Sequence, residues 1–233
     1  MALKDDLEKD VNAIVTQDWD IRDGQVVPET EDVALAGGAV KLTATMLYAD
    51  LADSTELAMY DRRIAAKTFK SFLTCCSKII RARGGDIRSF DGDRVMGVFI
   101  GNSKNTSAAK CALNINYAFL NIIKPKLEAK YNVFANGTYK LAHCTGIDTS
   151  EVLVVRSGIR NYNDLIWVGR SPNIAAKLSA VPSAPYFSFV TDTVYDNMAD
   201  TSKISSDNRN MWERCDWKGG VSVVYRSSWT WTP

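Results

Sequence analysis

The sequence predicts an α+β fold in which a split β-α-β core is followed by extra C-terminal strands. Three observations predict it. The apolar pattern switches along the chain between a period of two residues and a period near 3.6. An Asp-Gly step at residues 91–92 joins two short apolar runs as a tight hairpin turn. Glycine pairs at 37–38 and 84–85 separate neighbouring elements.

The first 36 residues are acidic and loosely patterned, and we expect them to form an N-terminal extension. Within them, "LEKDVNAIVTQDW" is predicted as a short helix, and "DGQVVPET" is typical of a turn or an extended connector. Residues 37–233 are predicted to form one domain.

The domain begins with a β-branched, apolar strand, "AVKLTATMLYADL", which ends in acidic residues. A helix is predicted from Asp61, because apolar residues recur there at spacings of three and four, and the glycine pair at 84–85 ends it. The hairpin of two short strands follows.

The second half begins with a helix from about Lys104 to Lys124, which Pro125 is expected to end. A later helix has Ser171 as its N-cap. The predicted strands of this half are "TYKLAHCTGI", "EVLVV", "NDLIWVG", "YFSFVTD" and "VSVVYRS". The order β-α-β-β-α-β is that of ferredoxin-like folds, which by itself decides no function.

The composition is that of an ordinary soluble globule, with 46% hydrophobic and 24% charged residues. A net charge of +1 gives no electrostatic footprint for nucleic acid or an anionic membrane, so we expect neither as a partner. No apolar run approaches the roughly 20 residues of a spanning helix, and the acidic start is unlike a signal peptide. The 5 cysteines include no CxxC pair, which predicts reduced core thiols in a cytoplasmic protein.

Acidic residues follow the first strand and occupy the hairpin turn. Tyr48 and Asp50 share one face of the first strand, because side chains alternate along a strand. In a split β-α-β sheet the first strand lies beside the hairpin, so Asp50 and Asp93 are predicted to meet. Two carboxylates held close repel each other, and a hard divalent cation relieves the repulsion. Asp91, in the same turn, is more simply explained as a solvated turn residue.

Four segments in this order resemble the class III nucleotidyl cyclases: "LYADLADST", "GGDIRSFDGDRVMGVF", "LAHCTGI" and "VGRSPNIAAKL". The resemblance covers roughly residues 40–182 and implies a class III cyclase homology domain. It also implies that Asp50 and Asp93 hold two divalent cations, Mn²⁺ or Mg²⁺, aided by the carbonyl of Leu51. One ion would lower the pKa of the ribose 3′-hydroxyl and the other would hold the triphosphate.

The resemblance assigns further residues to the nucleotide. Backbone amides entering the next helix would bind phosphate oxygens, namely those of Ala52, Asp53, Ser54 and Thr55. In the family an Asn and, four residues later, an Arg stabilise the transition state. This chain has Asn173 and Lys177 there, so one position departs from the motif, and Lys lacks the bidentate fork of Arg.

The positions that recognise a purine base in the family hold unsuitable residues here. Ser89 occupies the place of a Lys and Ile166 that of an acidic or small polar residue. This departure resembles the pyrimidine cyclases of the bacterial Pycsar antiphage systems. It implies synthesis of cyclic UMP from UTP on infection, sensed by a separate effector. Cyclic CMP from CTP, an adenylate or guanylate cyclase, and a nucleotide-binding module without turnover remain alternatives.

Other polar residues are candidates for substrate contacts. Tyr48 could line the base or ribose, or pack in the core, and Arg94 and Arg170 are candidates for triphosphate or base contacts. Lys218, in "DWKGG", resembles the triphosphate lysine of the family. His143, the single histidine, is interpreted as a core or interface residue.

The chain holds one copy of each motif, which implies that two copies of the chain pair to complete a site. In the family, the metal residues and the transition-state residues face each other across a subunit interface. The chain is therefore predicted to form a head-to-tail homodimer with two composite sites.

Overall fold

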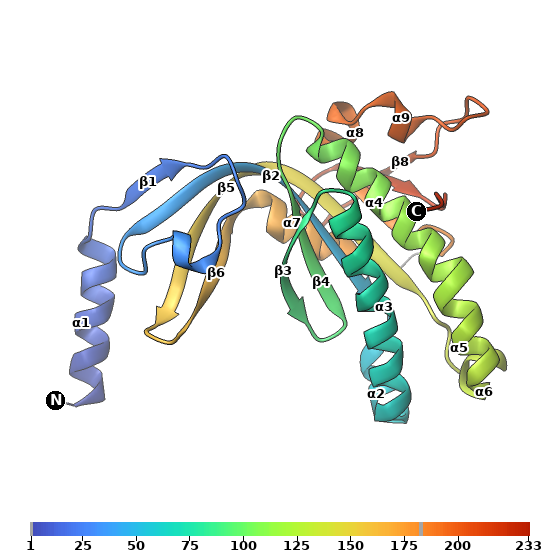
Figure 1. Ribbon diagram of the computed structural model, residues 1–233, viewed down its shortest axis with the longest axis horizontal. Helices are drawn as coiled ribbons and strands as arrows, with labels where there is room; N and C mark the ends of the chain where they lie inside the picture. The colour runs from blue at the N-terminus through green and yellow to red at the C-terminus, as the bar shows by residue number, and fades with distance from the viewer. Residues whose placement is uncertain (1, 182–183) are drawn as a thin grey trace. The chain divides into compact units, whose positions relative to one another are not determined.

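The structure, a computed structural model, describes residues 2–181 and 184–233 of the 233-residue chain (Figure 1). Its internal contacts divide into two compact units. Unit 1 contains the residues up to Thr43 together with Glu151–Gly169, and unit 2 contains Ala44–Ser150 and Arg170–Pro233. The domain boundary predicted at residue 36 stays a prediction. Two long strands, β2 (Gly38–Leu51) and β5 (His143–Ile159), contribute residues to both units.

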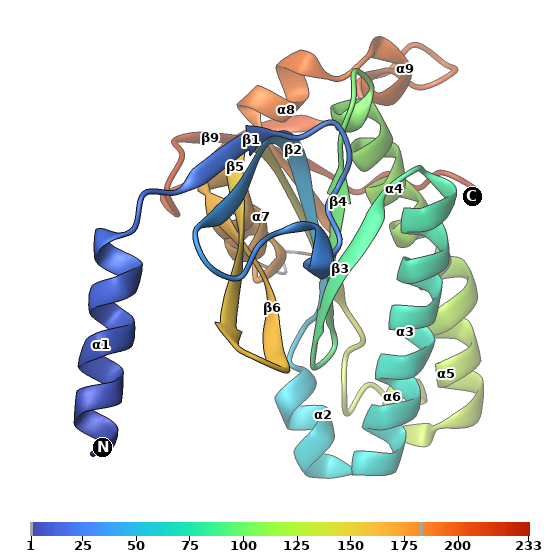
Figure 2. The same cartoon turned by 60° about the vertical axis from the view of Figure 1, so that its left-hand side comes forward.

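The described residues of unit 1 form one α-helix and short strands, which can be followed in Figure 2. Its elements besides β2 and β5 are α1 (Leu3–Thr16), β1 (Asp20–Asp23), the 3₁₀ turn η1 (Thr30–Asp32) and β6 (Tyr162–Gly169). β1 pairs in parallel with the start of β2, and β6 pairs antiparallel with the end of β5. The predicted N-terminal helix is confirmed, whereas β1 was not predicted because its four residues lack an apolar alternation.

Unit 2 contains the core of the fold, and its strands pair in the order β3-β4-β2-β5-β7-β9-β8. Its first elements are α2 (Ser54–Tyr60), α3 (Arg62–Ala82), β3 (Asp86–Asp91), β4 (Arg94–Phe99), α4 (Lys104–Ala118), η2 (Phe119–Ile123), α5 (Lys124–Lys130) and α6 (Asn132–Ala135). Its later elements are α7 (Arg170–Ser179), β7 (Ser188–Thr191), α8 (Asp192–Asn197), α9 (Asp200–Lys203), β8 (Glu213–Asp216) and β9 (Val223–Ser227). The predicted α+β class and the order β-α-β-β-α-β are confirmed in β2-α3-β3-β4-α4-β5.

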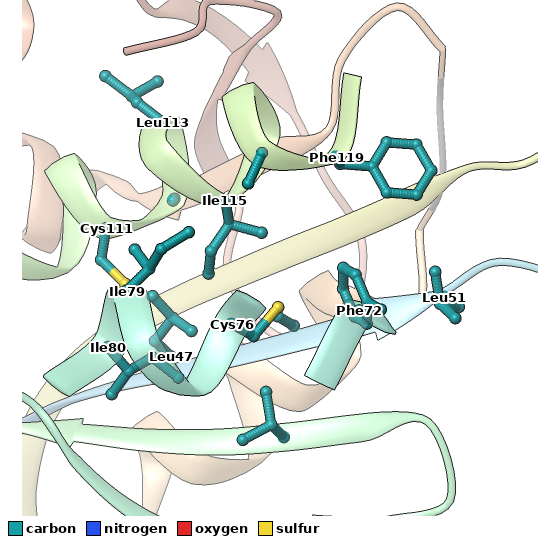
Figure 3. Packing of buried hydrophobic residues seen from close by; sticks show 14 of the residues in the cluster. Leu47, Leu51, Phe72, Cys76, Ile79, Ile80, Cys111, Leu113, Ile115 and Phe119 are labelled. Atoms are coloured by element: carbon teal, nitrogen blue, oxygen red, sulfur yellow. The ribbon is translucent and has the colours of Figure 1, made fainter. Parts of the chain in front are cut away.

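The main hydrophobic core lies between the sheet of unit 2 and the helices α3 and α4 (Figure 3). Leu47, Ala49 and Leu51 point from β2 into this core, which is the alternation expected of a strand. The largest side chains that fill it include Phe72, Ile80, Leu113, Ile115 and Phe119. Asp50, one position out of phase, therefore lies on the other face of the sheet.

A smaller core fixes α7 on that other face. Ile174 and Leu178 of α7 pack with Cys144 of β5. Gly146 makes the close approach possible, because an added Cβ would lie 2.2 Å from the carbonyl oxygen of Ala175. The sheet face that carries Asp50 is thus covered by α7 at β5.

Three sequence predictions need correction. The end of the run "TYKLAHCTGI", from His143, and "EVLVV" form one continuous strand, β5, since no turn separates them, whereas residues 138–142 are not in a strand. Pro125 does not end the second long helix, because the π-helical turn η2 precedes it and α5 continues to Lys130. α7 begins at Arg170, and the amide of Ser171 donates to the hydroxyl of Ser150, so Ser171 is not the N-cap.

Candidate active site

Asp50 and Asp93 meet at the end of β2. Asp50 is the penultimate residue of that strand, and Asp93 lies in the turn between β3 and β4. The backbone amide of Leu51 donates to Oδ2 of Asp93 over 3.2 Å. Burial, followed by the charge of the neighbouring Asp93, raises the pKa of Asp50 to about 6. The structure therefore brings the two predicted carboxylates together.

This pair fits a hard divalent cation. In the part of the chain that the structure describes, neither carboxyl takes part in a salt bridge, and no group of three or more His, Cys, Asp or Glu gathers as a metal site. Two carboxylates would leave coordination positions to backbone carbonyls, water or a ligand's phosphates, as Mg²⁺ usually requires. The residues present fit the cations that the resemblance implies.

Polar residues extend from Asp50 across one face of β2, β4 and β3. Tyr48 pairs with Met96, which pairs with Ser89, so the three form one cross-strand row. The Tyr48 hydroxyl donates to Met96 Sδ over 3.1 Å, and burial raises the pKa of Tyr48. The Arg94 guanidinium lies 5.5 Å from the centre of the Tyr48 ring and pairs with Asp91 at 2.9 Å. Three predicted substrate residues, Tyr48, Ser89 and Arg94, thus share the face of Asp50.

The turn after β2 is held by hydrogen bonds of its own. The amide of Ala52 donates to the carbonyl of Ala142 over 3.0 Å, so this amide is already satisfied. We therefore correct its assignment as a phosphate donor. Asp53 has a positive φ of 53°, and its carbonyl accepts from the amide of Glu56 over 3.0 Å. The roles of Asp53, Ser54 and Thr55 in phosphate binding stay predictions.

A second group of predicted residues gathers around α7. Asn173 and Lys177 both lie on this helix, four residues apart. The Lys177 ammonium donates to the carbonyl of Gly219 over 3.4 Å, and Lys218 is the preceding residue. The loop of Lys218 lines a shallow pocket with Asp216, Trp217 and Ser222. One part of unit 2 thus presents carboxylates and another presents lysines.

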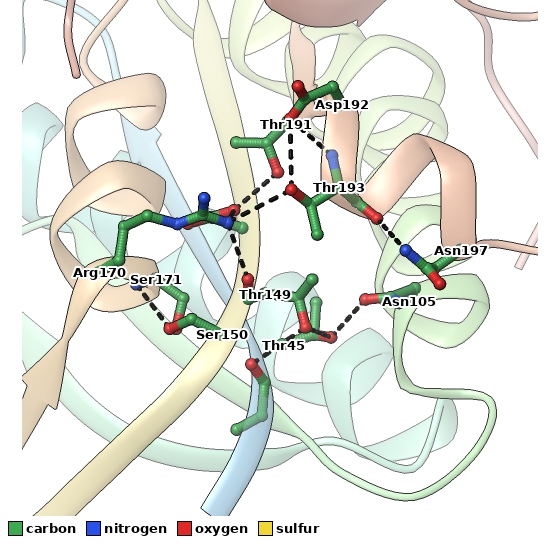
Figure 4. Close-up of polar contacts among 12 residues, drawn as sticks. Thr45, Asn105, Thr149, Ser150, Arg170, Ser171, Thr191, Asp192, Thr193 and Asn197 are labelled. Carbon is green, nitrogen blue, oxygen red and sulfur yellow. Dashed lines mark hydrogen bonds and ion pairs between the residues drawn. The ribbon is translucent and has the colours of Figure 1, made fainter. Parts of the chain in front are cut away.

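Arg170 anchors the start of α7 (Figure 4). Its Nε and Nη2 donate to the two carboxylate oxygens of Asp148 over 3.1 and 3.0 Å, and Nη2 also donates to the carbonyl of Thr149 over 3.0 Å. Asp148 is fully buried and also accepts from Thr191 Oγ1 over 2.6 Å. Four acceptors including Thr193 Oγ1 thus engage Nε and Nη2 of this guanidinium and fix the start of α7, and the predicted contact of Arg170 with substrate stays a prediction.

No protein-family model matches the chain. It is 46% identical to a uridylate cyclase of Rhodovulum sp. (strain MB263), over 98% of this chain and 97% of that protein. It is 41% identical to a uridylate cyclase of Xanthomonas perforans, over 99% of each chain. This chain belongs to the uridylate cyclase family.

A solved structure shows the same fold. The crystal structure of the adenylyl cyclase CyaB from P. aeruginosa superposes with a TM-score of 0.64 at 20% identity, covering 81% of this chain and 95% of that chain. The predicted class III cyclase fold and the predicted membership of a pyrimidine cyclase family are confirmed. No helix within the described residues combines the length and apolarity needed to cross a membrane.

The last predicted residue of this cyclase, Ile166, lies in unit 1. It is 47% exposed on β6 and lines a cavity of about 630 Å³ with α1 and the end of β5. Its predicted place beside the base stays a prediction. His143, by contrast, is confirmed as a core residue, since it is fully buried and burial lowers its pKa to about 3.

The sequence reasoning missed two residues that shape the site. Asp148, in "GIDTS", was not singled out, although a charged residue inside an apolar strand is a signal for a buried partner. Tyr139 donates its hydroxyl to the carbonyl of Ala52 over 2.6 Å and so supports the turn after Asp50. No pattern in the sequence marks Tyr139 for this role.

Proposed function

We propose that this chain converts UTP to 3′,5′-cyclic UMP and pyrophosphate. The main support for this proposal is that the chain is 46% identical to a uridylate cyclase along nearly the whole length of that protein. The adjacent carboxylates of Asp50 and Asp93 support it, because the family's chemistry requires acidic ligands at that place.

The reaction is an intramolecular phosphoryl transfer. The ribose 3′-oxygen attacks the α-phosphorus, the bond from this phosphorus to the bridging oxygen of pyrophosphate breaks, and the proton of the 3′-hydroxyl is released. Divalent cations, Mn²⁺ or Mg²⁺, held by Asp50 and Asp93 with the Leu51 carbonyl, would supply Lewis acidity and neutralise phosphate charge. Asp50 then serves as a ligand in its ionised form, which its raised pKa favours only above about pH 6.

Other residues of the chain bind and orient the nucleotide. Tyr48, Ser89 and Arg94 lie on the face next to Asp50, where an aromatic ring and a guanidinium can border a base and a phosphate. Asn173, Lys177 and Lys218 supply an amide and two positive charges for the phosphates in the transition state. Ser89 and Ile166 leave the base without the groups that read a purine.

The site is composite in this proposal. Asp50 and Asp93 come from one copy of the chain and Asn173 and Lys177 from another, in a head-to-tail homodimer. The carboxylates lie at the end of β2 and in the turn between β3 and β4, whereas the lysines lie on α7 and in the Lys218 loop, and their opposite charges support this arrangement.

Product analysis tests the substrate. The purified chain is incubated with Mn²⁺ and each of the four ribonucleoside triphosphates, and the products are separated. We expect cyclic UMP as the main product. Cyclic CMP as the main product would support the cytidylate alternative, and cyclic AMP or cyclic GMP would overturn the base assignment.

A mixing experiment tests the composite site. Asp50→Ala and Asn173→Ala chains should each be inactive, whereas their mixture should recover about one working site per mixed dimer. Failure of the mixture to recover activity, with both chains folded and dimeric, contradicts the shared site.

A second candidate is a nucleotide-binding module without turnover. Lys177 favours it, because Lys cannot form the bidentate contact of the family's Arg. If the chain is an enzyme, Lys177→Ala should lower kcat by about 10²-fold, and Lys177→Arg should retain activity. Tight binding of UTP without any product would establish the module.

We further propose that cyclic UMP acts as an antiphage signal for a separate effector, on the basis of the resemblance alone. Cyclic UMP should rise in cells that express the chain after phage infection, and it should not rise with Asp93→Asn. A rise that is independent of infection would contradict the proposed trigger.

A further inference from the structure

A groove lies between α3 and α5 on unit 2, away from the carboxylates. It has a volume of about 590 Å³, and Figure 2 shows the two helices next to each other. Cys75, Ile123 and Leu127 provide apolar lining. The lysines of the groove are Lys67 and Lys70 on α3 and Lys126 and Lys130 on α5. The groove is therefore apolar in its lining and basic at its edges.

The charge of this groove is strongly positive. α3 carries six Lys or Arg and no Asp or Glu, and α5 carries three Lys and one Glu. The Glu of α5 pairs with Lys124 at 3.9 Å. Within the described residues, none of the four groove lysines takes part in a salt bridge. An acidic occupant would neutralise them.

The chain itself provides an acidic amphipathic helix. α1 contains four Asp or Glu and two Lys, so its net charge is 2 − 4 = −2, and none of its residues is buried. Leu3, Leu7, Val11 and Ile14 form an apolar stripe along it and are between 55% and 73% exposed. A stripe of this kind normally packs against another surface.

We propose that α1 of one copy of the chain binds in the α3/α5 groove of a second copy. Leu7, Val11 and Ile14 follow the i, i+4, i+7 spacing of helices that bind in apolar grooves. At 1.5 Å per residue, Leu7 to Ile14 span about 10 Å and the groove lining of α3, Lys67 to Cys75, spans about 12 Å, so the three anchors fit within the groove.

The charges match in spacing as well as in sign. Asp6 and Asp10 lie four residues apart beside the stripe of α1, and Lys126 and Lys130 lie four residues apart at one edge of the groove. Pairing of two α1 helices would instead bring like charges together. An anionic lipid surface would meet the lysines, but it offers no ridge of side chains to fill the groove.

Cross-linking to a native thiol tests the contact. Cys75 lines the groove and is a free, partly exposed thiol. In Val11→Cys, a short bis-maleimide should join residue 11 of one copy to Cys75 of another, giving a species of twice the 25.8 kDa chain mass. The matched control is Lys9→Cys, which lies on the opposite side of α1 and should give at least about fivefold less product.

Peptide mass spectrometry identifies the joined residues. Val11→Cys combined with Cys75→Ser should lose the product, which excludes the partly exposed Cys215. A cross-link within one chain, equal yields at positions 9 and 11, or a product that survives Cys75→Ser would each overturn the proposal.

A charge exchange tests specificity. Lys126→Glu with Lys130→Glu should lower the cross-linking yield about fivefold, and a partner chain with Asp6→Lys and Asp10→Lys should restore it. These substitutions lie outside the site of Asp50 and Asp93, so cyclase activity serves as the check that the chains are folded. The groove lysines could instead bind phosphatidylserine vesicles while the charge substitutions leave the cross-linking yield unchanged. In that case a lipid surface is the occupant and the proposal fails.

Discussion

Asp148 and Asp50 lie on the same sheet of unit 2, and burial raises the pKa of both, but their neighbours differ. Asp148 is fully buried, but Arg170 and Thr191 satisfy both of its oxygens. Asp50 has a second carboxylate as its neighbour, and this charge adds to burial in raising its pKa to about 6. The protein supplies a cation, Arg170, for Asp148, whereas in our proposal the Asp50–Asp93 pair takes a divalent cation from solution. The Arg170–Asp148 pair thus stabilises the fold, and the carboxylate pair is the one we propose for the chemistry.

The largest effect is expected when one carboxylate of the Asp50–Asp93 pair is removed. Asp50→Asn or Asp93→Asn should lower the rate of cyclic UMP formation by about 10³-fold or more, because an amide is a poor ligand for a hard cation. The rate is measured with Mn²⁺ and UTP, and circular dichroism checks that the fold is retained. A rate within tenfold of the wild type would contradict the metal assignment.

The next largest effect is expected when the Arg170–Asp148 pair is broken. Asp148→Asn leaves the Arg170 charge without its partner and should destabilise the protein by about 3 kcal/mol, lowering Tm by about 6–12 °C. The matched control is Asp23→Asn, which breaks the exposed pair with Lys41 and should cost under about 0.5 kcal/mol. Equal losses of stability in the two variants would show that Asp148 has no special structural role.

A smaller effect is expected from Arg170→Lys. The charge remains, but the two parallel donors to Asp148 are lost, so stability should fall by about 1 kcal/mol. Because α7 carries Asn173 and Lys177, kcat should fall about tenfold with little change in KM. A change in KM alone would indicate a direct substrate contact.

The smallest expected effect is a gain in stability rather than a loss. The pKa of Asp50 is raised on folding, so the stability it contributes is present below about pH 4 and is lost as the pH rises through about 6. Without divalent cations, Asp50→Asn should therefore raise Tm at pH 7.5 by about 2–4 °C, allowing for solvent screening of a half-buried group.

Two further conditions sharpen this comparison. The difference in Tm should vanish near pH 4, and Mn²⁺ should stabilise the wild type more than Asp50→Asn. A variant that melts below the wild type at pH 7.5 without metal would show that the Asp50 charge is already satisfied.

The core of the fold was predictable because local signals and periodicity agree there. The β2 alternation, the spacing of apolar residues in α3 and the Asp-Gly turn each specify one element, and together they place Asp50 beside Asp93. The short elements β1, β8, α8 and α9 escaped prediction, since four to six residues carry too little periodicity.

Only those features of the site that follow from residue type were predictable from the sequence. Carboxylates near a hairpin point to a cation, whereas the partner of an arginine depends on tertiary contacts. Arg170 follows β6 directly, and no local pattern shows that its guanidinium pairs with Asp148. The amide of Ala52 is likewise satisfied by Ala142, about ninety positions away in the chain, which no local pattern reveals.

The π-helical turn at Phe119–Ile123 accommodates one extra residue in an otherwise continuous helical segment. Because the wide turn absorbs that residue, deletion of one residue within it would restore a regular α-helix and leave the following residues on the same face. Lys126 and Lys130 would keep their direction toward the groove. The same deletion inside α4 would instead turn every following residue by about 100°, so the turn is the place where this helical segment tolerates a change of length.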